Sequence, residues 1–527
     1  MEGSDPVLSC EEASQLERSV LDTEEKVWNA MTRVGRLLGR GLLTEYKFSR
    51  YRPENLFVVG LVGKGHNGGD ALLGIEEMAR RGSVGRVLLV LSDPQDKLKP
   101  HTGKALGLLE ERLPEDSLTT LACEENGEEE WIQEVGRSLE GQSVDLCLDG
   151  LIGMQFRPPL KRGARKIIEL MNGKPDVRLR VAVDLPSGMG DESDDHCFKA
   201  DVTFATGILK RPLLEEGRGK SIGSIRYLDI GLFKKSIESQ TLVLKDPLLD
   251  SLRRRRPPHV EKRNYGHLYI LAGSRQMPGA LIMSVRSALK SGVGRVTVCA
   301  PQSIVPVVAS LIPEAMWVPW PETPAGGLSS NGLDYIRTMH TKASALLVGP
   351  GMGDDPETAN MLIELLKRWT GSLVIDADAL QPRVLYWVQG VCIVTPHLGE
   401  FKRVAGLEGS IPNLGRELQA FAREHSIVVT LKGSMTRITD GDRLFLNTTG
   451  NSVLARGGSG DLLAGLTAGL LAQSPHNGLG AACKAVHWHG KAADLLANRQ
   501  GQVAVCTTEL LDFLGDALGE EDECIDR

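Results

Sequence analysis

The chain has 527 residues, 41% of them hydrophobic and 24% charged, as is typical of a globular protein of about two to four domains. The net charge of −7 argues against a general nucleic-acid-binding surface. The nine cysteines include no C-x-x-C pair, which favours reduced thiols over disulfides. We see no signal peptide and no apolar run near the roughly 18 residues that span a bilayer, so we expect a cytoplasmic protein without a membrane partner.

The first half opens with two predicted helices, the first beginning with a Ser9–Glu12 capping box. The apolar run Leu56–Val62 predicts a buried parallel strand that leads into the segment GKGHNGGD, residues 63–70. Its glycines match G-x-G-x-x-G, a pattern that is weak by itself. Asn67 and Asp70 make the loop polar, which indicates a ligand such as a cation or ribose hydroxyls besides a pyrophosphate.

Two later strands of this half are predicted to end in carboxylates. Val144–Leu148 leads to Asp149, and Arg180–Val183 leads to Asp184. A single Asp at such a position is often only a turn former. Because the carboxyl ends of parallel strands meet at one edge of a sheet, the two acids and the polar loop together favour a binding site there.

These segments resemble the NAD(P)HX epimerase family, whose substrates are hydrated NADH and NADPH. GKGHNGGD, DGLIG and VAVDLPSG, followed by residues 200–204 and Lys210, carry the resemblance over roughly Leu8–Leu232. It implies a Rossmann-like domain, a catalytic Asp184 and a potassium ion held by Asn67, Asp149 and Ser187. The implied substrate-binding residues are His66, Asn67, Gly68, Gly69, Asp70, Gly153, Met154, Gln155, Phe156, Arg157, Pro158, Pro159 and Asp184. The family usually has a second Asn at the position of His66, and Gly-Thr-Gly where this chain has Gly153-Met154-Gln155.

The segment after this half loses its periodicity and gains Lys, Arg and Pro. We therefore predict an epimerase-like domain over 1–232, a linker over 233–262 and a second domain over 263–527.

A second α/β series is predicted beyond the linker. Its strands are expected at His267–Ala272, Arg295–Cys299, Ala345–Val348, Leu373–Ile375, Val391–Val394 and Ile427–Thr430, with a helix starting near Pro278. Thr436–Thr439 and Arg443–Leu446 flank Asp440-Gly441 and predict a hairpin. The predicted fold class is therefore α/β, with two doubly wound three-layer domains.

The glycine-rich segment Gly457–Gly460 leads directly into Asp461. Leu462, Leu466 and Leu470 predict a helix with one buried face after it. Free backbone N–H groups at the positive end of a helix suit a phosphate or a developing oxyanion, and Asp461 would be a base beside them. An ordinary N-cap role for Asp461 is the alternative.

The segments GPGMG, DADAL, TPHLGEF, KGSMT and GGSGD, in this order across about Asn264–Leu514, resemble the ribokinase-like superfamily. The opening YGHLYILAGS with MPGA is most similar to the ADP-dependent NAD(P)HX dehydratases. The resemblance implies that Asp461 is the base and that Ala280, Gly351, Gly353, His397 and Asp461 bind the hydrate. It assigns ADP to Lys432, Gly433, Ser434, Met435, Thr436, Gly457, Gly458, Ser459 and Gly460, with Asp376 and Glu400 as candidate carboxylates for Mg²⁺ or water.

The two resemblances together predict a bifunctional repair enzyme. The first domain, with K⁺, would interconvert the R and S hydrates, and the second would dehydrate the S form with ADP and Mg²⁺. The expected partners are NADHX, NADPHX, ADP and further copies of the chain in a homo-oligomer, without nucleic acid. Two alternatives stay open: a small-molecule kinase whose product keeps its phosphate, and a first half that only binds a dinucleotide.

His487 and His489 could suggest a metal pair. Residues two apart on a helix do not share a face, so we expect both side chains to pack instead.

Overall fold

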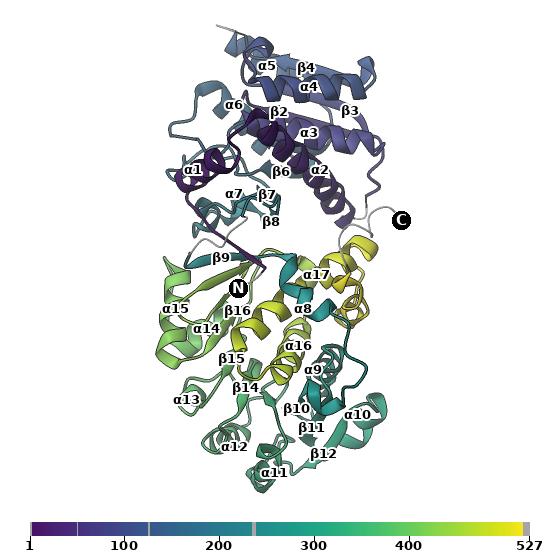
Figure 1. Cartoon of the computed structure of the whole chain (residues 1–527), viewed down its shortest axis with the longest axis vertical. Helices are drawn as coiled ribbons and strands as arrows, with labels where there is room; N and C mark the ends of the chain where they lie inside the picture. The colour runs from purple at the N-terminus through teal and green to yellow at the C-terminus, as the bar shows by residue number, and fades with distance from the viewer. Residues whose placement is uncertain (1–2, 50, 125–126, 234–238, 520–527) are drawn as a thin grey trace. The chain divides into compact units, whose positions relative to one another are not determined.

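The protein is described from a computed structural model that covers residues 3–49, 51–124, 127–233 and 239–519. The chain divides into an N-terminal unit, Asp5–Ser239, and a C-terminal unit, Met1–Ser4 with Gln240–Arg527. Each unit is built around its own sheet (Figure 1). Among the described helices, none combines the length and the apolar character that crossing a membrane requires.

The N-terminal unit has a sheet whose described strand pairs are all parallel. Its order is β4 (Leu118–Ala122), β3 (Val84–Leu91), β2 (Leu56–Val62), β5 (Val144–Gly150), β6 (Val177–Val183), β7 (Val202–Thr206) and β8 (Ser224–Leu228). From β2 the chain first builds the sheet toward β4 and then, from β5, toward β8. The reversal between β2 and β5 is the switch point at which doubly wound sheets bind ligands.

Helices cover both faces of this sheet, because successive strand side chains point to opposite faces. One face carries α2 (Glu24–Phe48), α3 (His66–Arg80) and α4 (Pro100–Arg112), and the other carries α5 (Glu128–Leu139) and α6 (Arg162–Gly173). On β2, Val58 and Val62 enter the first core, whereas Val59 and Leu61 enter the second. The predicted capping box of Ser9 and Glu12 is confirmed at the start of α1 (Cys10–Val20).

The C-terminal unit has a larger, mixed sheet. Its order is β1 (Ser4–Pro6), β9 (Thr241–Leu244), β18 (Leu444–Asn447), β17 (Thr436–Thr439), β16 (Val428–Leu431), β15 (Cys392–Val394), β14 (Ser372–Ile375), β13 (Ala345–Val348), β10 (His267–Leu271), β11 (Arg295–Pro301) and β12 (Met316–Trp320). The strands from β16 to β12 are parallel, and β17 with β18 forms the predicted antiparallel hairpin. The switch point of this sheet lies between β10 and β13.

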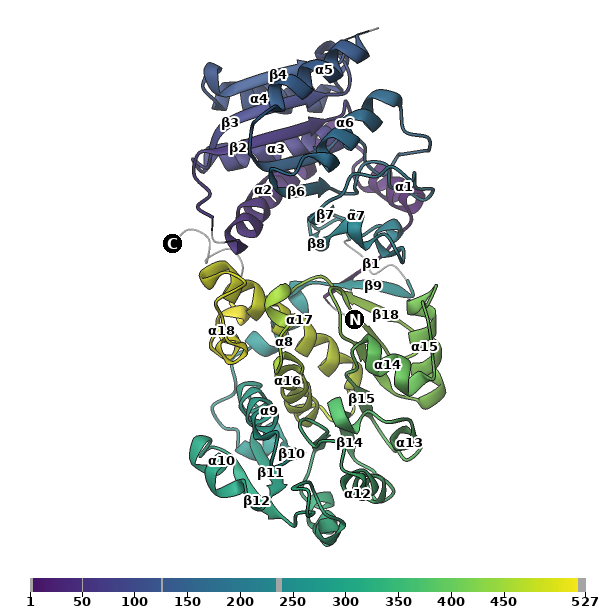
Figure 2. The same ribbon diagram turned by 180° about the vertical axis from the view of Figure 1, so that it is seen from behind.

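Two helix layers enclose the C-terminal sheet. Helices α9 (Pro278–Lys290), α16 (Ser459–Gln473) and α17 (Gly478–Gln500) pack together on one face (Figure 2). The other face is covered by α12 (Pro356–Leu366), α13 (Pro382–Leu385), α14 (Leu398–Ala405) and α15 (Leu414–His425). Shorter helices are α8 (Asp250–Arg253), α10 (Val305–Leu311), α11 (Ile336–His340) and α18 (Leu510–Phe513), with α7 (Gly219–Ile222) in the N-terminal unit.

Helix α16 differs from its predicted form in two respects. It begins at Ser459 with Gly458 as its N-cap residue, so Asp461 lies within the first turn and is not an N-cap. It is also buried around its whole circumference instead of on one face. A Cβ added at Gly465 would stand 2.1 Å from the carbonyl oxygen of Ser284 in α9, so this glycine allows the two helices to approach closely. His487 and His489 on α17 are buried, as expected for packing.

The predicted linker over 233–262 is too long. Thr241–Leu244 forms β9, which pairs in parallel with β18, and Asp250–Arg253 forms α8. Residues 234–238 of the predicted linker lie outside the described residues. The apolar run TLVL was the available signal, but four residues among Lys, Arg and Pro are too few for a periodic pattern.

Candidate active sites

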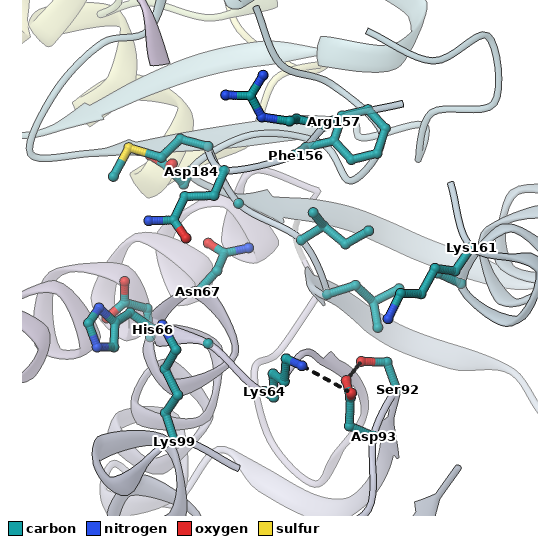
Figure 3. Close-up of a pocket in the computed structure, with 18 of the residues that line it drawn as sticks. Lys64, His66, Asn67, Ser92, Asp93, Lys99, Phe156, Arg157, Lys161 and Asp184 are labelled. Atoms are coloured by element: carbon teal, nitrogen blue, oxygen red, sulfur yellow. Dashed lines mark hydrogen bonds and ion pairs between the residues drawn. The ribbon is translucent and has the colours of Figure 1, made fainter. Parts of the chain in front are cut away.

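A cavity of about 780 Å³ opens at the carboxyl edge of the N-terminal sheet (Figure 3), and we call it the N-terminal cavity. Its walls come from α1 and from the segments that follow β2, β3, β5 and β6. The predicted residues that line it are His66, Asn67, Asp70, Gly153, Met154, Gln155, Phe156, Arg157, Pro159 and Asp184. A cavity of this size matches a small-molecule or cofactor site.

Three residues predicted to bind substrate are not among the residues that line the N-terminal cavity: Gly68, Gly69 and Pro158. A Cβ added at Gly68 would stand 2.0 Å from the carbonyl oxygen of Gly63, and one at Gly69 would stand 2.4 Å from Cε of Met31 in α2. These two glycines therefore allow the loop to close and α3 to pack against α2.

Asp184 follows β6 in a left-handed conformation, with φ of 67°, which residues other than glycine rarely adopt. Its Oδ1 accepts hydrogen bonds from Thr206 Oγ1 at 3.1 Å and from the ammonium group of Lys210. Lys210 is buried, and its Nζ also donates to the carbonyl oxygen of Thr206 at 3.2 Å. The carboxylate is thus held in one orientation by two donors on the same oxygen.

Two further acids of the cavity have raised pKa values. Burial raises the pKa of Asp70 well above its usual range, and the negative charge of Asp184 raises it further. Asp70 Oδ1 is buried, with no hydrogen-bond partner among the described residues. Burial raises the pKa of Glu17 to about 7, against the opposing effect of Lys210. The cavity therefore places Asp70, a buried acid with a raised pKa, near Asp184, the carboxylate held by Lys210.

The residues predicted to hold potassium meet beside the loop after β5. Asp149 is fully buried, and its two oxygens accept hydrogen bonds from Ser187 N at 2.7 Å and Ser187 Oγ at 2.6 Å. Burial raises the pKa of Asp149 to about 6 in spite of these bonds. Asn67 Nδ2 is buried without a partner among the described residues, and a Cβ added at Gly153 would stand 3.6 Å from Asn67 Oδ1.

Cationic side chains gather along the rest of the cavity: Arg18, Lys64, Lys99, Arg157 and Lys161. Burial lowers the pKa of His66, and the nearby charge of Lys99 lowers it further, so His66 is neutral at pH 7. This distribution of charge suits the phosphates of a dinucleotide at the N-terminus of α3.

A second group of candidate site residues lies at the switch point of the C-terminal sheet, and we call it the C-terminal site. Its members are Ala280, Gly351, Gly353, Asp376, Asp378, Lys432 and Asp461. Gly351 has a φ of 64°, and a Cβ there would stand 2.9 Å from Cβ of Ala280 in α9. The backbone N–H of Gly353 donates to Asp378 Oδ2 at 2.8 Å. Ala280, Gly351 and Gly353 therefore lie close together, while their role in binding the hydrate stays a prediction. Asp378 was not predicted as a site residue, although it is the second acid of the DADAL segment.

Lys432, which is predicted to bind ADP, lies close to Asp376 and to the start of α16, where the predicted base Asp461 stands. Its Nζ donates to Asp376 Oδ1 at 2.9 Å, and a Cβ added at Gly460 would stand 3.2 Å from the same Nζ. Burial raises the pKa of Asp461 to about 7, helped by the charge of Asp376 and opposed by Lys432. A carboxyl group with this pKa can act as a general base near neutral pH.

The other predicted residues of this site lie on the surrounding segments. His397 caps α14 by accepting from Gly399 N at 3.0 Å, while Glu400 accepts from the backbone N–H of His397 at 2.8 Å. Gly433, Ser434 and Met435 form the turn between β16 and β17, and Thr436 begins β17. Gly457 precedes the N-cap residue of α16, and Ser459 is the first residue of that helix.

Sequence reasoning missed several residues of the N-terminal cavity: Glu17, Lys64, Ser92, Asp93, Lys161 and Thr206. A usable signal existed for Asp93. It follows β3, just as Asp184 follows β6 and Asp149 lies near the end of β5.

Comparison with known proteins gives matches for both units. Residues 29–212 match the family described as YjeF-related protein N-terminus, and residues 268–515 match NAD(P)H-hydrate dehydratase. A bifunctional NAD(P)H-hydrate repair enzyme of Moorella thermoacetica is 34% identical over 86% of this chain and 85% of its own length. One from Thermosynechococcus vestitus is 33% identical over 88% and 87%. An ADP/ATP-dependent NAD(P)H-hydrate dehydratase structure from Bacillus subtilis is 27% identical and covers 50% of this chain and 92% of its own, with a TM-score of 0.44.

Proposed function

The chain belongs to the family of bifunctional NAD(P)H-hydrate repair enzymes, and from this premise we propose how its two sites work. The enzyme epimerises the R and S hydrates of NADH and NADPH and dehydrates the S hydrate to NAD(P)H with ADP. We assign epimerisation to the N-terminal cavity and dehydration to the C-terminal site. The observation that carries this assignment is that residues 268–515, which include the C-terminal site, match NAD(P)H-hydrate dehydratase, whereas the N-terminal cavity lies in the unit that matches the other family.

Epimerisation requires the hydroxyl group to leave the hydrated ring carbon and to return on the other face. The ring nitrogen lone pair breaks the carbon–oxygen bond, and Asp70, whose raised pKa favours its acid form, gives a proton to the departing oxygen, so that water leaves. A water molecule then adds to the opposite face of the planar ring cation and gives its proton to Asp184 Oδ2. The reverse reaction uses the two acids in exchanged roles.

The residues at Asp149 fit a potassium ion. The buried carboxylate of Asp149, the side-chain amide oxygen of Asn67 and the hydroxyl group of Ser187 offer one negative charge and two neutral oxygens. Such a set of ligands suits a monovalent cation better than a divalent metal ion, which is usually bound by more carboxylates. Asn67, Asp149 and Ser187 would hold the ion, which would supply positive charge beside the loop that contacts the substrate's phosphates.

Dehydration turns the hydroxyl group into a better leaving group. Asp461 removes the hydroxyl proton while that oxygen attacks the terminal phosphorus of ADP, and AMP leaves. The ring nitrogen then expels phosphate, and the neighbouring ring carbon loses a proton to give NAD(P)H. The backbone N–H groups at the start of α16 and the ammonium group of Lys432 stabilise the negative charge on the transferring group.

Mg²⁺ would enter this site on the phosphates of ADP. Asp376 is buried and accepts from Lys432 and from Thr395 Oγ1 at 2.7 Å, so its Oδ1 already has two donors. Glu400 caps α14 and lies 3.9 Å from Lys432 Nζ. Asp376 and Glu400 therefore already bind groups of the protein. We propose that their role is to position the ammonium group of Lys432.

A time course on mixed R and S hydrates with ADP tests the proposal. The wild type should convert both epimers to NAD(P)H with release of free phosphate. Asp184→Asn should consume the S epimer and leave the R epimer, whereas Asp461→Asn should form no NAD(P)H. Wild-type regeneration by Asp461→Asn would refute the assigned base. A phosphorylated product that accumulates would favour the kinase alternative, and rapid consumption of the R epimer by Asp184→Asn would refute the assigned epimerase residue.

We also propose that the protein is a homo-oligomer. Helix α10 and the edge strand β12 expose Val307 (64%), Leu311 (49%) and Met316 (45%), a group of apolar side chains that a second copy can cover. Light scattering after size-exclusion chromatography should give a multiple of the 57.1 kDa chain mass. Val307→Glu should reduce that mass if α10 lies in the contact.

The cytoplasm remains our proposed location. The described cysteines are all free thiols, and burial raises the pKa of Cys147 and Cys299, as expected of core thiols. Fluorescence of a tagged chain in its native cell would test this location.

A further inference from the structure

The N-terminal cavity continues well beyond the acids that perform the chemistry. Asp184 follows β6, whereas Ser92 and Asp93 follow β3 and line the same cavity (Figure 3). Strands β2 and β5 lie between β3 and β6 in the sheet. Three strand spacings of about 4.8 Å place the two groups roughly 14 Å apart along the edge. This distance suits the two halves of a dinucleotide.

Ser92 and Asp93, which follow β3, are held in position by hydrogen bonds within the protein. Ser92 Oγ donates to Asp93 Oδ2 at 2.8 Å, and the backbone N–H of Ser92 donates to the carbonyl oxygen of Val62 at 3.0 Å, which ties the segment to β2. Lys64 Nζ lies 3.7 Å from Asp93 Oδ1. Lys64 is 55% exposed and Asp93 22% exposed, so this ion pair contributes little to stability and can open for a ligand.

The strand order indicates which part of the substrate would contact Ser92 and Asp93. The order β4-β3-β2-β5-β6-β7 is that of a doubly wound dinucleotide-binding sheet, with the glycine-rich loop after its first strand, β2. In such sheets an acid at the end of the next strand accepts hydrogen bonds from the adenosine ribose. Here that strand is β3 and the acid is Asp93.

We propose that Asp93, oriented by Ser92, binds the adenosine ribose hydroxyls of NADHX and makes the epimerase discriminate against the 2′-phosphate of NADPHX. The inference rests on the proposed epimerase function of the N-terminal cavity. The carboxylate accepts from the free 2′-hydroxyl, whereas a 2′-phosphate would remove that donor and add negative charge beside it. Lys64, whose Nζ lies 3.7 Å from Asp93 Oδ1, can reach such a phosphate, and it reduces the discrimination without abolishing it.

The test measures epimerisation alone, in the full-length protein without ADP, by following pure R-NADHX and pure R-NADPHX chromatographically. The wild type should have the higher kcat/KM for R-NADHX. Asp93→Asn keeps the side-chain volume and removes the charge, and it should lower the NADHX-to-NADPHX ratio of kcat/KM about tenfold through KM, as expected for loss of a charged hydrogen bond. Asp96→Asn, at an exposed acid three residues along the chain, is the matched control and should keep the wild-type ratio.

Binding gives a second readout. ADP-ribose and 2′-phospho-ADP-ribose are used as inhibitors of the same assay, and Asp93→Asn should weaken the first and tighten the second. Lys64→Met, on a half-exposed side chain, should raise the inhibition constant of the phosphorylated probe more than that of ADP-ribose. An unchanged ratio in Asp93→Asn, in both kcat/KM and inhibition, would overturn the inference. Failure of the proposed function would appear differently, as rapid epimerisation by Asp184→Asn.

Discussion

Lys210 and Asp184 form a buried ion pair beside the N-terminal cavity, and Thr206 donates to the same carboxylate oxygen. The pair joins the segment after β6 to the segment after β7. Burial raises the pKa of the nearby Asp70, and the negative charge of Asp184 raises it further, whereas the charge of Lys210 opposes this effect. The ion pair therefore orients the proposed catalytic carboxylate of Asp184 and contributes to the electrostatic environment of Asp70.

Lys210→Met tests this relationship. It leaves Asp184 as a buried charge without its cation, so it should lower the free energy of unfolding of the N-terminal unit by about 3–5 kcal/mol. Epimerisation should be lost while dehydration of pure S hydrate is retained. The double variant Asp184→Asn/Lys210→Met should recover much of the stability in chemical denaturation but none of the epimerisation. Equal instability of the single and double variants would contradict an ion-pair role.

The pH dependence of dehydration should report Asp461. The base acts when it is deprotonated, so kcat/KM should fall as the pH drops below the raised pKa of about 7. Asp376→Asn removes a negative charge that raises this pKa, and it should move the acidic limb of the profile to lower pH. Glu400→Gln is the control, because Glu400 also lies near Lys432 but is not among the causes of the Asp461 shift. An acidic limb that stays in place in Asp376→Asn would contradict the assignment.

Asp461 should also affect the pH dependence of the free energy of unfolding, with the opposite sign to carboxyl groups whose pKa is lowered on folding. Because its pKa is raised in the folded state, the folded protein keeps the proton to higher pH than the unfolded chain. The contribution of Asp461 to the free energy of unfolding should therefore fall as the pH rises from 3.8 to about 7. Asp461→Asn should remove this fall, which denaturant titrations at pH 5 and pH 8 can measure.

Removal of potassium should impair epimerisation and spare dehydration by the other unit. Asp149→Asn removes the charge that would hold the ion, so the apparent dissociation constant for K⁺ should rise at least about tenfold, equivalent to the loss of one charged contact. The measurement is the epimerisation rate against K⁺ concentration at constant ionic strength, with choline as the replacing cation. An enzyme that works equally well without K⁺ would refute the site.

Gly458 and Gly457 offer a matched pair at the start of α16. Gly458 has a φ of 91°, and a Cβ there would stand 2.3 Å from Sδ of Met283, whereas a Cβ at Gly457 meets nothing within 4 Å. Gly458→Ala should lower the free energy of unfolding of the C-terminal unit by about 1–2 kcal/mol, the usual cost of a left-handed residue with a side chain. Gly457→Ala should change it by less than about 0.5 kcal/mol. Thermal unfolding of both variants gives the comparison.

Local patterns predicted much of the fold. Leu56–Val62 was predicted with the bounds that β2 has, because a strand buried on both faces is apolar along its whole length. The placement of Asp149 and Asp184 at strand ends could also be predicted, since parallel strands bring their carboxyl ends to one edge. β9 was missed because its partner, β18, lies about two hundred residues away in the chain and four residues carry little periodic signal.

The sequence by itself determined the two α/β units, the glycine-rich loops and the carboxylates at the strand ends, because these depend on neighbouring residues and on a regular period. Only the tertiary structure decided which charges meet. In the folded protein, Lys210 pairs with Asp184, and Asp70 is buried near that pair. Lys432 lies between Asp376 and the start of α16. The protonation states that the proposed chemistry needs arise from burial and from such long-range neighbours, neither of which a local pattern contains.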